Sequence, residues 1–160
     1  MKFFALILSL SLLFPLVFSQ TSELTKQHSL LTTQCKNIRG HAGRIIAEAD
    51  EAKLNRDVAS AHLDEIAKYH TQMELQITSS KKLLDAGQLK SVAAEYKSLE
   101  KTCSSIGDLV VKLRKEFEKK EPAGPTVRNL AKTLRSEMST GYDVHERMKK
   151  KIGISKLRRS

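Results

Sequence analysis

Residues 89–117, LKSVAAEYKSLEKTCSSIGDLVVKLRKEF, decide the fold class of this chain. Apolar or small side chains recur in this stretch at steps of three and four residues without a miss, at Leu89, Val92, Tyr96, Leu99, Cys103, Ile106, Val110, Leu113 and Phe117. Only an α-helix places residues at that spacing on one face. The stretch therefore predicts a long amphipathic helix with one buried face.

Two helical stretches precede this one. Residues 24–52 repeat apolar or small side chains every seven positions, as the packed face of a coiled-coil-like helix does. Residues 59–84 carry a second apolar stripe. We expect a turn at 55–57 between them, with Asp57 as the cap of the second helix. Gly87 is expected to end that helix, because glycine readily adopts the left-handed conformation that follows a helix.

A fourth helix is predicted after a break in the chain. The segment 121–125, EPAGP, contains two prolines and a glycine and cannot continue a helix. Thr126 is expected to cap the next helix, whose apolar stripe runs to Met148. Gly141 is expected to weaken the centre of this helix.

Long helices joined by short connections fold back on one another. We therefore expect an all-α chain: an elongated up-down-up-down bundle of about four long amphipathic helices with coiled-coil-like seams, formed by residues 20–148. The absence of Trp and the low aromatic content agree with helices rather than sheets. The apolar seams also leave open a coiled-coil homodimer.

Residues 1–19 predict a cleaved signal peptide. Lys2 precedes an apolar run over residues 3–18, and small Ser19 stands before neutral Gln20. The run is shorter than the roughly 20 residues that span a bilayer, and it contains Pro15. We therefore expect a secreted, extracellular protein, or a periplasmic one if the source is bacterial, with no transmembrane segment after cleavage.

The chain has two cysteines, Cys35 and Cys103. In an oxidising compartment an even pair is usually a disulfide. The two residues lie at similar heights on the first and third helices, which run parallel in such a bundle, and both fall on inward faces. This placement predicts an intramolecular Cys35–Cys103 disulfide. Two buried thiols or an intermolecular bond are the alternatives.

No residue pattern points to catalysis or to a cofactor. Di-iron bundles place Glu-x-x-His pairs inward, whereas this sequence has only the reversed pair of His62 and Glu65. His28 and His145 lie near apolar stripes at similar heights, and we expect them to be partly solvated. Neither a nucleophile elbow nor a phosphate-binding glycine motif occurs. We expect no metal site, no cofactor and no enzymatic activity.

Positive charge is concentrated in the last quarter of the chain. The net charge is +10, and residues 122–160 contain ten Lys or Arg against three Asp or Glu. We expect residues 149–160 to form a basic C-terminal tail. The expected anion- or partner-binding residues are Arg147, Lys149, Lys150, Lys151, Lys156, Arg158 and Arg159.

A basic surface predicts an acidic partner, which could be a glycan, a protein or an anionic lipid surface. Specific nucleic-acid recognition is not expected, because the few aromatic residues lie mostly in the core stripe. These observations favour a secreted, non-catalytic helical-bundle binding protein. A carrier that holds a small amphipathic molecule or lipid in the bundle core is the alternative, and the tail could also serve only to keep the protein soluble.

Overall fold

The computed structural model describes residues 4–154, with side chains from Thr21 onward. Regular structure in this range is entirely helical, and no strand occurs in it. The prediction of an all-α chain of packed helices is therefore confirmed. Four of the five helices are long and one is short: α1 (Phe4–Asp50), α2 (Arg56–Lys82), α3 (Ala86–Ser91), α4 (Ala93–Phe117) and α5 (Gly124–Lys151).

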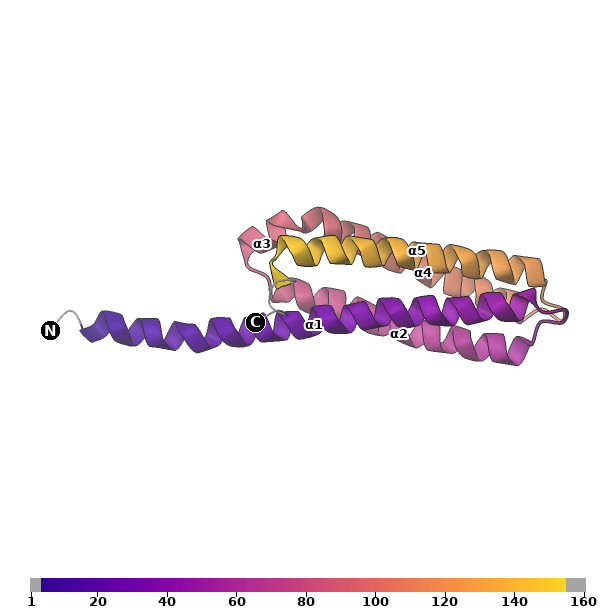
Figure 1. The fold of residues 1–160 in the computed structure, drawn as a ribbon, viewed down its shortest axis with the longest axis horizontal. Helices are drawn as coiled ribbons and strands as arrows, with labels where there is room; N and C mark the ends of the chain where they lie inside the picture. The colour runs from indigo at the N-terminus through magenta and orange to yellow at the C-terminus, as the bar shows by residue number, and fades with distance from the viewer. Residues whose placement is uncertain (1–3, 155–160) are drawn as a thin grey trace.

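The long helices pack lengthwise around one core (Figure 1). Both α1 and α4 pack against α2 and α5, so α1 and α4 lie diagonally across the bundle from each other. The predicted seams are its interior: Leu31, Ile38 and Ile45 of α1 have no exposed surface. In α4 the residues Leu99, Ile106 and Leu113 are equally buried, at 1% exposed or less.

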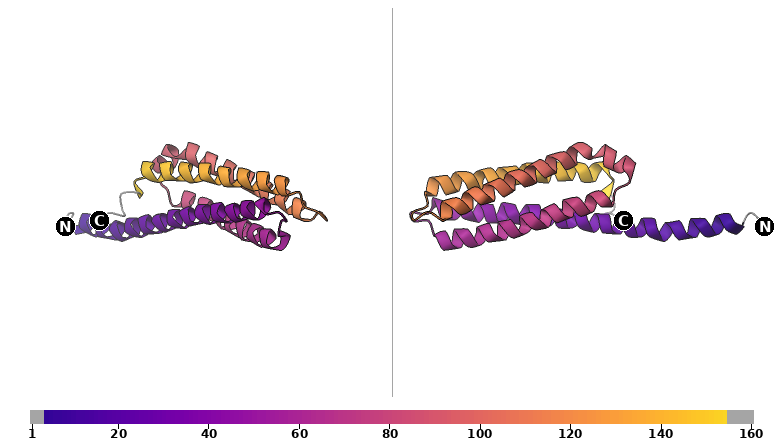
Figure 2. Two further views of the ribbon diagram at one scale, coloured as in Figure 1. Left: turned by 45° about the vertical axis from the view of Figure 1, so that its right-hand side comes forward. Right: turned by 180° about the vertical axis from the view of Figure 1, so that it is seen from behind.

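The N-terminal part of α1 projects beyond the other helices, as both views in Figure 2 show. The helix is continuous through the predicted cleavage position after Ser19. Leu24 is a buried residue of the packed part. Among helices in the described part of the chain, none combines the length and apolar character needed to cross a bilayer.

The third predicted helix is divided in two. It breaks at Val92, whose φ of −118° and ψ of 13° are not helical. Gly87 was expected to end the second helix, but α2 ends at Lys82 and Gly87 lies inside α3. A reciprocal cap starts α3 instead, since the Asp85 carboxylate accepts from Gln88 N–H at 2.8 Å and the Gln88 side-chain oxygen accepts from Asp85 N–H.

Two other helix starts lie a few residues before the predicted ones. The turn before α2 is present, but its cap is Asn55 rather than Asp57, and the Asn55 side chain accepts from Val58 N–H. Helix α5 begins at Gly124 without a side-chain cap, instead of at Thr126. The buried Glu116 carboxylate accepts from Ala123 N–H at 3.0 Å and so satisfies the backbone that enters α5.

Gly141 does not interrupt α5, which runs through it to Lys151. The residue is buried against α4, and a Cβ atom added there would lie 2.9 Å from Thr102 Cγ2. Glycine therefore lets the two helix backbones approach closely, which offsets its low helix propensity.

The predicted disulfide is not formed: Cys35 and Cys103 are two buried free thiols. Their expected inward faces agree with the structure, because both belong to one buried core. The diagonal placement of α1 and α4 was missed. If neighbouring axes are about 8–10 Å apart, diagonal axes are about 12 Å apart. Facing Cα atoms then lie near or beyond the roughly 7 Å limit for a disulfide.

Candidate functional site

The predicted basic tail begins inside α5. Arg147 and Lys149–Lys151 occupy the last turns of this helix, and Ile154, which follows it, is buried. Helix α5 thus continues three residues past the predicted boundary between residues 148 and 149. The other three predicted binding residues, Lys156, Arg158 and Arg159, lie outside the described residues.

Two of the predicted binding lysines are engaged within the fold. Lys149 forms an ion pair with Glu146 at 2.6 Å, and its side chain is only 17% exposed. Lys151 pairs with Glu95 of α4 at 2.6 Å. The hydrogen bond from Lys151 lowers the pKa of the Glu95 carboxyl. Lys151 thus links the end of α5 to the start of α4, while its side chain remains 48% exposed.

The remaining cations of α5 form an exposed surface. Lys132, Arg135, Arg147 and Lys150 are exposed, and within the described part of the chain none of them has a carboxylate ion-pair partner. Helical spacing places all four on the outward side of α5. We name these four residues the basic face. Exposed Asp143 lies among them as an acidic interruption.

This surface continues towards α1. The guanidinium of Arg135 lies beside Gly43, 3.9 Å from where a Cβ atom would stand. Arg39 of α1 lies over the Tyr142 ring of α5, with 6.0 Å between guanidinium carbon and ring centroid. Helix α5 itself contains seven Lys or Arg against three Asp or Glu. The excess of positive charge predicted from the sequence therefore belongs largely to an ordered helix.

His28 of α1 and His145 of α5 meet in the core. They were expected to be partly solvated, but both have no exposed surface, and 2.8 Å separates His28 Nδ1 from His145 Nε2. Burial, assisted by the charge of nearby Lys149, lowers the pKa of His28 to about 4. Burial and the adjacent His28 lower the pKa of His145 to about 2. Both imidazoles are therefore neutral at physiological pH.

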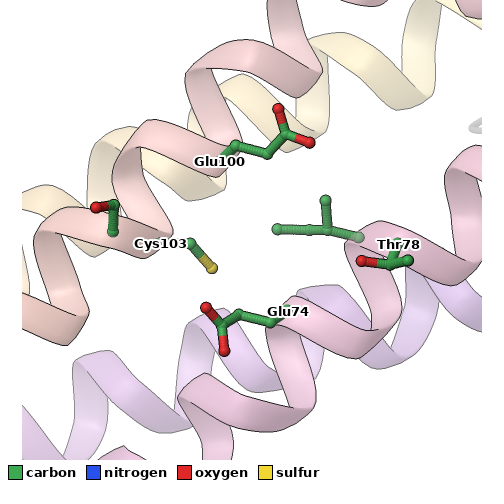
Figure 3. Close-up of a pocket in the computed structure, with 6 residues that line it drawn as sticks. Glu74, Thr78, Glu100 and Cys103 are labelled. Atoms are coloured by element: carbon green, nitrogen blue, oxygen red, sulfur yellow. The ribbon is translucent and has the colours of Figure 1, made fainter.

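A second group of polar side chains lies at the α2–α4 seam. Here a groove of about 280 Å³ is lined by Glu74, Ile77, Thr78, Glu100, Cys103 and Ser104. Figure 3 shows the Cys103 sulfur and the Glu74 carboxylate pointing toward each other across it. His70 lies next to them, and its Nε2 is 2.8 Å from the Cys103 carbonyl oxygen.

This group was not predicted from the sequence. The metal motif considered was Glu-x-x-His, whereas His70 and Glu74 are four positions apart and the third member comes from another helix. A search for His and Glu at positions i and i+4 could have found the pair on α2. Their proximity to Cys103 depends on how α2 and α4 are rotated against each other, which periodicity does not define.

Comparison of the chain with protein-family models, with curated proteins and with solved structures found no match.

Proposed function

We propose that this protein is a secreted, non-catalytic binding protein whose basic face attracts an acidic partner. Its four long helices would act as one up-down-up-down bundle, with α3 as an entry turn to α4. The observation that carries the proposal is the set of four exposed α5 cations that have no carboxylate partner among residues 21–154. Cations held on one helix attract polyanions more strongly than the same charges dispersed over a surface, because their potentials add.

Two features support the secretory part of the proposal. The N-terminal run has the composition of a signal peptide. The same segment belongs to the part of α1 that projects beyond the other helices, so its removal would leave the packed part of the bundle in place (Figure 1). The N-terminus of the secreted chain should then be Gln20, which mass spectrometry of the mature protein would measure.

The core packing supports binding at the surface over a carrier function. Large side chains from four helices fill the interior, among them Tyr96, Leu113 and Met138, each exposed by 1% or less. A lipid guest would have to displace such residues, and each large side chain removed from a core contact costs about 2–5 kcal/mol. The homodimer predicted from the seams stays a prediction.

The test compares two fourfold variants that remove equal charge. In the first, Lys132, Arg135, Arg147 and Lys150 are replaced by Gln. In the control, four exposed lysines dispersed over α1, the α1–α2 loop, α2 and α4 are replaced by Gln: Lys36, Lys53, Lys82 and Lys112. Retention on heparin should fall clearly in the first variant and only slightly in the control, and the difference should shrink as salt screens the charges.

Anionic and neutral lipid vesicles provide a second probe and separate a membrane surface from a glycan. A third variant that ends at Ile154 removes Lys156, Arg158 and Arg159 while retaining the Lys151–Glu95 pair. Equal retention of both fourfold variants would contradict a role for the basic face. If only the chain ending at Ile154 loses binding, recognition belongs to the terminal residues instead.

A further inference from the structure

Three side chains with different metal-binding atoms converge at the α2–α4 seam. His70, Glu74 and Cys103 each offer one ligand atom, and these three atoms lie within 4.8 Å of one another. We propose that they form a binding site for Zn²⁺. The site lies at a different seam from the basic face, so the proposal does not depend on the proposed function.

The helices place the three groups for structural reasons that can be traced. His70 and Glu74 are one turn apart on α2 and share a face. The imidazole lies against α4 at Gly107, where a Cβ atom would be in van der Waals contact with His70 Cε1 at 3.4 Å. The 2.8 Å contact of His70 Nε2 with the Cys103 carbonyl oxygen then holds the ring next to the thiol.

An imidazole, a carboxylate and a thiol are the ligand types that zinc prefers, and three protein ligands leave a fourth position for water. With Zn–ligand bonds of about 2.0–2.3 Å, the edge of a tetrahedral site measures about 3.5 Å. The three atoms must therefore approach by about 1 Å. Glu74 can supply much of this movement, because its side chain is 54% exposed. Coordination through His70 Nε2 would replace its contact with the carbonyl oxygen.

The surroundings allow both access and charge balance. Cys103 is only 4% exposed, but it lines the groove together with Thr78 and Glu100, which would give an ion a path to the sulfur (Figure 3). Glu100 is already paired with Lys81, so it competes little for the ion. As the zinc–sulfur bond forms, the Cys103 thiol loses its proton to water. One thiolate and the Glu74 carboxylate then neutralise the two positive charges of the ion, which a half-buried site requires.

The two cysteines provide a matched control for the test. Mature protein without a histidine tag is titrated with Co²⁺ as a spectroscopic substitute for Zn²⁺. The wild type and Cys35→Ser should both show thiolate-to-cobalt charge-transfer absorption that Zn²⁺ displaces at one equivalent. Cys103→Ser should lose this absorption, because a hydroxyl does not replace a thiolate ligand. Circular dichroism would establish that both serine variants are folded.

Glu74→Gln tests the site without disturbing the core, since this side chain is half exposed. Loss of outer-shell partners already weakens metal binding by about 10- to 100-fold, so removal of a ligand should raise the Zn²⁺ dissociation constant at least tenfold. Glu100→Gln should change it little. The proposal is overturned if the wild type shows no charge-transfer absorption, or if Cys35→Ser loses the absorption while Cys103→Ser keeps it. It is also overturned if Glu74→Gln binds Zn²⁺ as tightly as the wild type.

Discussion

The buried pair of His28 and His145 should make this protein lose stability in mild acid. An unfolded histidine has a pKa near 6.5, whereas the folded values are lowered to about 4 for His28 and about 2 for His145. Below pH 6.5 the unfolded chain therefore binds protons that the folded chain does not. The stability that the two neutral histidines contribute is therefore complete above pH 6.5, and it is lost as pH falls towards their folded pKa values.

The size of the effect follows from the two shifts. Between pH 6.5 and pH 5 each histidine remains neutral in the folded protein. Each pH unit in this range therefore lowers the free energy of unfolding by about 1.4 kcal/mol per histidine. The loss by pH 5 is then about 2 kcal/mol for each residue, or roughly 4 kcal/mol for the pair. A domain of this size has a total stability on the order of 5–15 kcal/mol, so the change is large enough to measure.

The assay is urea unfolding at several pH values between 5 and 8, for the wild type and for the double variant H28L/H145L. The variant should lose most of the pH dependence, because leucine fills a similar space without a titratable group. Repetition at high salt separates this effect from the repulsion of the net positive charge, which salt screens and which both proteins share. Equal free energies of unfolding at pH 5 and pH 7 in the wild type would refute the reasoning, as would an unchanged slope in the double variant.

Three further predictions concern the core. Ile106→Ala and Leu113→Ala should each lower the free energy of unfolding by about 2–5 kcal/mol, because both residues are fully buried; losses below 1 kcal/mol in urea unfolding would contradict this. Gly141→Ala should destabilise α5 packing, since overpacking costs about 1–3 kcal/mol and the new Cβ lies 2.9 Å from Thr102 Cγ2; the added change Thr102→Ser should restore stability. Cys35 and Cys103 should resist thiol reagents until the metal-free protein unfolds, because burial raises the pKa of each thiol to about 12. Rapid labelling in the native state would contradict their burial.

The helices and their buried faces could be predicted because they depend on local spacing. The three-four repeat in residues 89–117 identifies the buried side of α4 without knowledge of any neighbour. Helix ends were less predictable, since several residue types can cap the same turn. Asp85 caps α3, where Gly87 suggested a stop, and Asn55 caps α2 two residues before Asp57.

Side-chain partners across the bundle could not be read from the sequence in the same way. The count of positive charges in the last quarter was available, but the pairing of Lys151 with Glu95 joins residues far apart in the chain. That pairing gives Lys151 a structural contact that the charge count does not reveal. Likewise, the depth of His28 depends on α5 packing against α1, and sequence position alone suggested partial solvation.

The state of the thiols connects the expected compartment with the proposed zinc site. Free cysteines are uncommon in secreted proteins, because oxidising surroundings join them. Here the diagonal placement of α1 and α4 disfavours a bond within the chain, and burial keeps the thiolate fraction of Cys35 low, which protects it from oxidation. Cys103 has the same raised pKa and is likewise buried, at 4% exposed, although it lines the groove at the α2–α4 seam. Coordination to zinc would hold its sulfur in a defined state, so the proposed cluster of His70, Glu74 and Cys103 would have a structural role that requires no catalysis.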